Sequence, residues 1–301
     1  MARRRTLAWL GPAVSLVGAP AFAQTRPPEP RVDWTADSII TAAGVGVALG
    51  ASLIPVDCSR RWKTELLPFD RAACRTFSSS AADWSNGLVM LTVALPVALQ
   101  VGAGVDEAAG KRLLVYGETL SLTLALNSVT KYLVGRPRPH VYHSDPRVSD
   151  YAERQGKDSH LSFFSGHTAI AFAAAVSGSY LFTQTSNDRG ARTGVWGTEL
   201  FLAAATAGLR VRAGQHFPSD VLVGAVVGTG LGVAIPSLHY SGRHPRALST
   251  AEWIAVGVGP SLGALASAFW PFPSDVLTPL DTALAPWVTE RGAGLAWAGK
   301  W

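Results

Sequence analysis

The stretch from residue 208 to residue 225 places two arginines, a histidine and an aspartate between two apolar segments, where an uncompensated charge is costly. Asp220 follows His216 by four residues, which is about one helical turn. Its carboxylate can therefore accept a hydrogen bond from the Nδ1–H of His216, which leaves Nε2 as a nucleophile and stabilises the imidazolium, as in a catalytic triad. A second histidine, His167, can protonate a leaving oxygen. These residue types predict nucleophilic transfer chemistry that uses two histidines.

An anion site is predicted from residues at the ends of the neighbouring apolar segments. Lys131, Arg138 and Arg210 supply three cations, and the two guanidinium groups have the planar geometry that suits phosphate oxygens. Ser165 and Gly166 begin an apolar helix, whose first backbone N–H groups and positive dipole end attract an anion. Such a clamp stabilises the charge on a phosphoryl group in its transition state. The predicted chemistry is phosphoryl transfer, for which we expect no cofactor.

Apolar segments of helical length must position these side chains. A membrane span needs roughly 20 mostly apolar residues, and no stretch before residue 250 shows sustained strand alternation. We therefore predict an all-α, integral-membrane bundle of about six helices; for the less apolar segments, burial in a soluble helical protein is the alternative. The six segments are residues 36–56, 86–105, 113–134, 167–184, 198–211 and 220–239.

Alternate crossing of the membrane would bring the charged residues together. The third segment ends, and the fourth begins, at one face, and the fifth ends and the sixth begins at that same face if every segment crosses. The active site is therefore expected at one membrane face. Glycines spaced four residues apart also favour close helix packing, and they are Gly46, Gly50, Gly224, Gly228 and Gly232.

The composition fits a membrane protein and excludes a nucleic-acid-binding one. Of the 301 residues, 48% are hydrophobic and 16% are charged, below the roughly 25% charged that is typical of soluble domains. The net charge of +5 includes the charges of Arg3, Arg4 and Arg5, and the rest of the chain has no basic stripe. The membrane is the expected partner, and nucleic acid is not.

Three motifs in these segments resemble the signatures of the type-2 phosphatidic acid phosphatase superfamily, whose fold is shared with bacterial acid phosphatases and vanadium haloperoxidases. The first motif is Lys131–Pro139, with six residues between the lysine and Arg138. The second is Phe164–His167, which has a phenylalanine where the family has a proline. The third is Leu209–Asp220, which has a leucine where the family has a serine and keeps the spacing of the charged residues.

The resemblance, which covers roughly residues 85–240, implies a role for each matched residue. His216 would form a phosphohistidine supported by Asp220, and His167 would be the general acid. The implied function is hydrolysis of a lipid phosphate or pyrophosphate in the membrane. Alternatives are lipid phosphotransfer on the same site, haloperoxidase chemistry, and a non-catalytic lipid-binding protein. The phosphate would be held, without a metal, by Lys131, Arg138, Ser165, Gly166 and Arg210.

The chain divides into four predicted parts. Residues 1–5 are basic, residues 6–20 are mostly apolar, and Ala21–Ala23 has the small-x-small pattern of a cleavage site. For the first part, an uncleaved anchor helix is the alternative. For the last part, residues 249–301, the sequence allows an aromatic belt, a seventh apolar segment near 252–270 or a short hairpin. The parts are a signal peptide (1–23), a linker (24–35), a membrane-embedded phosphatase domain (36–248) and a tail of unknown structure (249–301).

Other polar residues near the motifs have no predicted part in catalysis. Arg136 and Arg212 are expected to be solvated or to face lipid. Glu118, a carboxylate within an apolar segment, is either functional or a hydrogen-bonded partner. Cys58 and Cys74 lie in one polar loop, and the sequence allows either a disulfide between them or two free thiols.

The expected location is the inner membrane of a bacterium, with the active site facing the periplasm as the resemblance implies. If Gln24 is exported and all six segments cross, however, the catalytic face lies in the cytoplasm. If residues 36–56 do not cross fully, that face lies in the periplasm. Five basic residues in the loop after this segment favour the cytoplasm by the positive-inside rule; they are Arg60, Arg61, Lys63, Arg71 and Arg75.

Overall fold

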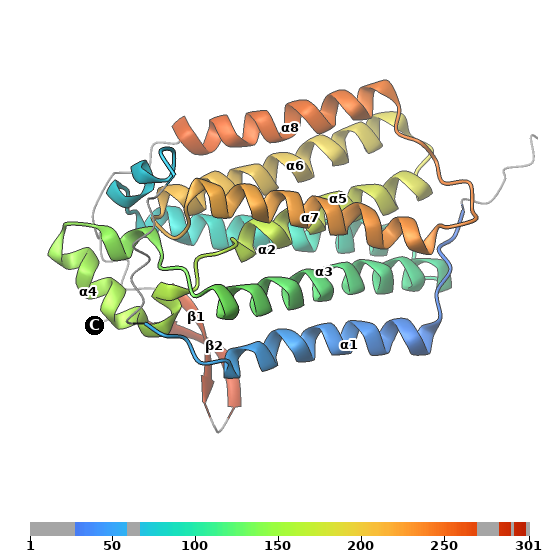
Figure 1. Ribbon diagram of the computed structural model, residues 1–301. Helices are drawn as coiled ribbons and strands as arrows, with labels where there is room; N and C mark the ends of the chain where they lie inside the picture. The colour runs from blue at the N-terminus through green and yellow to red at the C-terminus, as the bar shows by residue number, and fades with distance from the viewer. Residues whose placement is uncertain (1–27, 59–66, 270–282, 290–291, 299–301) are drawn as a thin grey trace, which may run out of the picture.

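In the computed structural model, which describes residues 28–58, 67–269, 283–289 and 292–298, long helices lie side by side (Figure 1). The long helices are α1 (Trp34–Gly50), α2 (Ser79–Gly102), α3 (Glu107–Val134), α5 (Gly166–Thr185), α6 (Arg189–Arg212), α7 (Pro218–His239) and α8 (Thr250–Phe269). The short helices are α4 (Pro146–Gln155) and the 3₁₀ turns η1 (Ala51–Leu53), η2 (Arg71–Arg75), η3 (Pro139–Tyr142) and η4 (Gly156–His160). An antiparallel hairpin of β1 (Ala283–Thr289) and β2 (Gly292–Ala298) follows them in the chain.

The predicted membrane bundle is confirmed. Most of each of the six apolar segments lies within a long helix, and the seventh, near 252–270, is α8. The fifth helix is longer than its predicted range of 198–211, because α6 begins at Arg189. Among the described residues, four helices are long and apolar enough to cross a membrane: Trp34–Leu53, Ser79–Gly102, Pro218–His239 and Thr250–Phe269.

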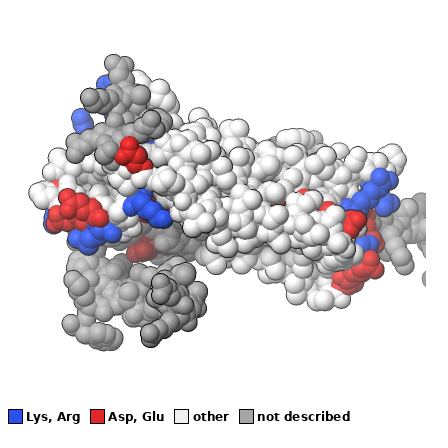
Figure 2. All heavy atoms as spheres, turned by 60° about the horizontal axis from the view of Figure 1, so that its bottom comes forward, with Lys and Arg blue, Asp and Glu red and all other residues white. Residues whose placement is uncertain are grey.

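The surface has the distribution of charge that a bilayer requires. On the face shown in Figure 2, acidic and basic side chains gather near the two ends of the molecule, and the middle is almost free of them. Large apolar side chains point outward along α1, α2, α7 and α8, where a lipid tail can cover them. Examples are Leu49, Met90, Val226 and Ile254.

The helices alternate in direction, and this alternation defines two ends of the bundle (Figure 1). Residues 51–58 and 67–78 and the loops 135–165 and 213–217 lie at one end, which we call the catalytic end. Residues 28–33 and the loops 103–106, 186–188 and 240–249 lie at the far end. The backbone N–H of Arg31 donates to the carbonyl of His239 at 2.7 Å, which fixes the start of the described chain at the far end. Helix α1 therefore runs along the bundle from the far end to the catalytic end.

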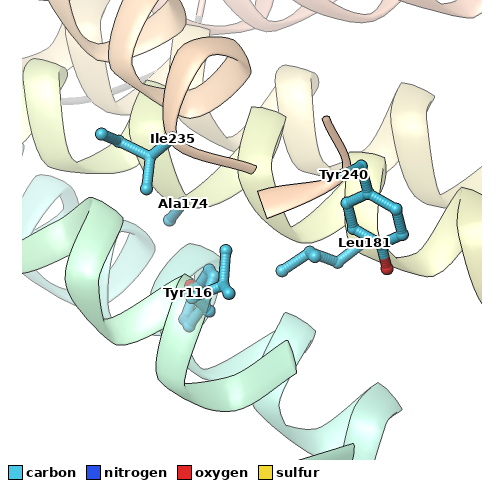
Figure 3. Packing of buried hydrophobic residues seen from close by; sticks show 6 residues of the cluster. Tyr116, Ala174, Leu181, Ile235 and Tyr240 are labelled. Atoms are coloured by element: carbon cyan, nitrogen blue, oxygen red, sulfur yellow. The ribbon is translucent and has the colours of Figure 1, made fainter. Parts of the chain in front are cut away.

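The interior is built around α5, which packs against α2, α3, α6 and α7. One buried cluster joins side chains of α3, α5 and α7 with Tyr240, the residue after α7 (Figure 3). The hydroxyl of Tyr116 donates to the carbonyl of Val93 at 2.9 Å, which satisfies a polar group that burial would otherwise penalise. The cluster residues labelled in Figure 3 are Tyr116, Ala174, Leu181, Ile235 and Tyr240.

The glycine ladder of α7 brings α5 and α7 close together, as the spacing predicted. A Cβ atom on Gly224 would lie 2.7 Å from the carbonyl oxygen of Ser165, and one on Gly228 would collide with the backbone of Ala169. The first residues of both helices are consequently neighbours. The matching prediction for α1 is wrong, because a Cβ atom on Gly46 or Gly50 would have no neighbour within 4 Å among the described residues.

Candidate active site

His216 lies in the loop between α6 and α7 and is completely buried. Its Nδ1 lies 2.8 Å from the backbone carbonyl oxygen of Ser162. A carbonyl oxygen only accepts hydrogen bonds, so Nδ1 carries the proton and Nε2 carries the lone pair. Nε2 is buried and has no hydrogen-bond partner among the described residues. The ring is thus held in the tautomer that leaves Nε2 as a nucleophile.

Asp220 supports His216 indirectly. Its Oδ2 lies 3.8 Å from Nδ1 of His216, beyond hydrogen-bond distance, so the predicted direct bond between the two side chains is replaced. Instead, Oδ2 accepts from the hydroxyl of Ser162 at 2.6 Å and from the backbone N–H of Phe217 at 3.0 Å. Ser162 therefore joins the pair, since its carbonyl binds the histidine and its hydroxyl binds the carboxylate. The sequence motifs do not contain this residue.

Arg136 is the second residue that sequence reasoning missed, and its expected exposure is wrong. The side chain is only 11% exposed and forms ion pairs with Asp220 and Asp70, both of which are completely buried. The distance to Asp70 is 3.0 Å. The guanidinium group also stacks over the ring of Phe217, 4.1 Å from its centre. Asp70 in turn accepts from the backbone N–H and hydroxyl of Ser219, so the first turn of α7 is fixed from two sides.

The three cations named from the sequence approach the same histidine from different elements. Lys131 stands in the last turn of α3, Arg210 in the last turn of α6, and Arg138 just before η3. Arg138 is buried, donates to the side-chain oxygen of Gln215 at 2.5 Å and pairs with the carboxylate of Asp158 at 2.8 Å.

Arg210 is buried as well. It donates to the hydroxyl of Ser85 at 3.3 Å, and its Nε has no partner among the described residues. Its backbone carbonyl accepts from the N–H of His216 at 3.3 Å. The cation and the nucleophile are thus held by one short piece of chain.

The N-terminus of α5 supplies the remaining predicted residues. Ser165 caps the helix and is buried, and its backbone N–H donates to the carbonyl of Asp220 at 3.1 Å. A Cβ atom on Gly166 would lie 2.6 Å from Oδ1 of Asn127 and 3.5 Å from Nζ of Lys131. Glycine is therefore needed for the helix end to approach the lysine.

The second histidine that the sequence singled out, His167, lies in the first turn of the same helix. Nε2 of His167 lies 2.8 Å from Oδ1 of Asn86 on α2, a contact that orients the ring and that no motif predicts. His167 is within electrostatic reach of Arg210, His216 and Lys131. All eight residues predicted from the sequence therefore lie at the catalytic end, and at least four elements contribute to the group.

The electrostatic environment keeps the nucleophile neutral. Burial lowers the pKa of His216 well below its usual range, and the positive charges of Arg138, Arg210 and Lys131 lower it further. The same loop buries His140, whose Nδ1 lies 3.1 Å from the carbonyl of Gly214. Burial, followed by the charge of Arg138, lowers the pKa of His140 to about 3. Both rings are uncharged near neutral pH, so the cations remain available for an anion.

Other polar residues of the sequence lie elsewhere. Glu118 is at the far end, where its carboxylate lies 3.1 Å from Nε2 of His239, so it is a hydrogen-bonded partner and not part of this site. Arg212 donates to the carbonyl of Ser267 at 2.8 Å and is half-buried rather than solvated. Both cysteines are free thiols; Cys58 is exposed and Cys74 is half-buried. Burial raises the pKa of Cys74.

Residues 112–243 match the family model described as the PAP2 superfamily. Over these residues the chain is similar to that superfamily, as the three motifs led us to expect. The match contains every residue predicted for the site, from Lys131 to Asp220, and spans α3 to α7 almost completely. No curated protein and no solved structure matches the chain. This similarity is to a family of phosphatases, and the geometry above gives the residues with which such a site would act.

Proposed function

We propose that this protein is a membrane phosphatase that hydrolyses a lipid phosphate or pyrophosphate through a phosphohistidine on His216. The observation that carries the proposal is the state of this ring. Its Nδ1–H is held by a carbonyl, and its buried Nε2 lone pair is unpartnered among three cationic side chains. A buried nitrogen without a partner is costly unless a ligand meets it.

The first step transfers the phosphoryl group to the protein. Nε2 of His216 attacks phosphorus, the bond from phosphorus to the ester oxygen breaks, and His167 gives a proton to the departing oxygen. Positive charge that develops on the His216 ring is opposed by the buried carboxylate of Asp220 through Ser162. Lys131, Arg138, Arg210 and the N-terminus of α5 stabilise the phosphoryl oxygens in the transition state.

The second step regenerates the protein. Water attacks the phosphohistidine, the bond from Nε2 to phosphorus breaks, and the proton lost by the water returns to His167. Inorganic phosphate leaves, and both histidines regain their starting states. An alcohol in place of water would complete a phosphotransfer, so product analysis with and without an acceptor alcohol separates the two reactions.

A lipid substrate is favoured by the place of the site in the bundle. The catalytic residues lie at the end of apolar helices, and four of these helices can cross a membrane. A lipid can keep its tails in the bilayer while its phosphate reaches the cations at the membrane face.

The direct test is release of phosphate from phosphatidic acid in detergent micelles by the purified full-length protein. His216→Ala should reduce the rate by at least about 10³-fold, because the nucleophile is lost. His244→Ala is the matched control, since His244 is exposed at the far end, and it should keep the wild-type rate. Equal rates for the wild type and His216→Ala would end the proposal and favour a non-catalytic lipid-binding protein.

We further propose that the protein lies in the inner membrane of a bacterium, with the catalytic end toward the periplasm. Because α1 crosses the bundle, this orientation places residues 28–33 in the cytoplasm and is incompatible with export of Gln24. Cys58 is exposed at the catalytic end, so its reactivity shows which side of the membrane that end faces. An impermeant maleimide should label Cys58 in spheroplasts, and Cys58→Ser should lose that label. Labelling of Cys58 only after the membrane is permeabilised would place the site in the cytoplasm.

A further inference from the structure

An apolar cavity of about 610 Å³ lies away from the active site, between α5, α6, α7 and α8. Helix α8 packs along α6, helix α7 packs along α5, and the cavity lies between these two pairs. Its lining includes Val176 and Trp196, which are buried, and Val233, which is partly exposed. The volume is in the range of pockets that bind small molecules.

The cavity extends along the membrane normal. Phe172 and Gln184, both of α5, line its two ends and are 12 positions apart, which corresponds to about 18 Å along a helix. This length is close to half of the roughly 30 Å hydrocarbon core of a bilayer, which is the depth of one leaflet. A lipid tail therefore fits the cavity in length and in chemistry.

A second, polar cavity of about 460 Å³ adjoins it at the far end. Arg189, Arg192 and Arg246 line this cavity, together with Asn187 and Ser249. Arg246 and its neighbour Ala247 line both cavities, so the apolar space leads directly to the arginines.

The charge of these arginines is only partly compensated. Arg192 pairs with the buried carboxylate of Glu252 at 2.8 Å. Arg246 donates to the carbonyls of Thr183 and Ser186 and to the side-chain oxygen of Asn187, all of which are neutral acceptors. Those bonds hold the guanidinium group in place but do not neutralise its positive charge.

Arg189 adds a second uncompensated cation. Its side chain is exposed, and it has no polar contact with the described residues. Two guanidinium groups, one fixed and one free to move, therefore stand where the apolar cavity reaches the membrane face. A phosphate group is the ligand that such a pair binds well.

We propose that these joined cavities bind an anionic phospholipid of the membrane leaflet opposite the catalytic end. Its phosphate lies against Arg189 and Arg246, and one acyl chain fills the groove between α7 and α8. The bound lipid bridges α7 and α8, which contact each other little among the described residues. This site is separate from the one that would hold the substrate phosphate, and it does not depend on the proposed catalytic function.

The test is lipid binding to delipidated full-length protein in detergent, measured by native mass spectrometry. The probes are dioleoylphosphatidylglycerol, dioleoylphosphatidylcholine and glycerol phosphate. We expect phosphatidylglycerol to bind at least about tenfold more tightly than phosphatidylcholine, because both phosphates can meet the arginines but the quaternary ammonium of phosphatidylcholine is repelled by them. Glycerol phosphate, which has the charge without the tails, should not bind detectably.

Three variants locate the binding. The double variant Arg189→Gln with Arg246→Gln should bind phosphatidylglycerol no better than phosphatidylcholine. Val233→Trp fills the groove and should weaken both lipids. Arg243→Gln is the matched control, because Arg243 is exposed at the same end but lines neither cavity, and it should keep the preference. If the double variant does not fold, Arg189→Gln alone, at an exposed position, should still weaken phosphatidylglycerol several-fold.

Equal binding of the two phospholipids would overturn the proposal. So would an equal loss in Arg243→Gln and in the double variant, because the effect would then come from surface charge in general. Tight binding of glycerol phosphate would show that the site binds an anion and not a lipid. Unchanged lipid binding in Val233→Trp would show that the acyl chain does not occupy the groove.

Discussion

Replacement of Arg136 by glutamine tests whether the buried ion pairs hold the active site together. The substitution keeps a hydrogen-bonding side chain and removes the charge that Asp70 and Asp220 share. Both carboxylates are fully buried. Removing one partner from a buried ion pair costs about 3 to 5 kcal/mol, because a charge is left without compensation. That is a large part of the roughly 5 to 15 kcal/mol by which folded proteins are stable.

The structure also limits this cost. Asp70 keeps two hydrogen bonds from Ser219, and Asp220 keeps those from Ser162 and Phe217. We therefore expect Arg136→Gln to lose about 3 kcal/mol of unfolding free energy, at the lower end of that range.

The assay is reversible chemical unfolding of the purified protein in mixed micelles, followed by circular dichroism. Asp70→Asn in the Arg136→Gln background should recover part of the loss, with a coupling of about 0.5 to 3 kcal/mol in a double-mutant cycle. Arg147→Gln is the matched control, since Arg147 forms an exposed ion pair with Asp145 at the same end, and it should leave unfolding unchanged. If Arg136→Gln unfolds like the wild type, or if the two changes simply add, the buried pairs do not support the site.

Two further predictions concern the surroundings of the nucleophile. Gly166→Ala should lower phosphate release at least about tenfold with little change in unfolding, because the new Cβ would displace Asn127 and Lys131 from the helix end; an unchanged rate would show that the lysine does not need this approach. The free energy of unfolding should also fall as the pH drops below about 6.5 and continue to fall toward about 3. In this range His140 binds a proton in the unfolded state but not in the folded state, because burial lowers its pKa to about 3. The slope from this residue is about 1.4 kcal/mol per pH unit, so urea unfolding between pH 6.5 and 5 should depend less on pH in His140→Asn, and an identical slope would contradict the assignment.

The catalytic end could be predicted from the sequence because charge among apolar segments is informative by itself. His167, His216 and the three cations stand at segment ends with a fixed spacing, and the alternation of helices leaves them one common face. The predicted length of α6 was too short for a related reason. Arg192 interrupts the apolar pattern, yet it is buried against Glu252 of α8, a partner that is distant in the sequence.

The parts that sequence reasoning missed depend on contacts between distant segments. Arg136 and Arg138 flank one proline and look equivalent in the sequence, but Arg136 pairs with Asp70, which is 66 positions away. The acceptor for His216 is a backbone carbonyl, and every residue has one, so no pattern of side chains could single out Ser162. Gly46 and Gly50 of α1 matched the spacing of a packed helix, and yet neither has a neighbour close to it among the described residues.

The phosphohistidine is the feature that the central claim requires, and it can be trapped. Full-length protein is mixed with phosphatidic acid that carries ³²P in its phosphate, quenched in alkali within milliseconds, digested and sequenced by mass spectrometry. We expect an alkali-stable, acid-labile label on the peptide that contains His216, and no label in His216→Ala. Phosphate release without any labelled histidine, or a label on a different residue, would contradict the account.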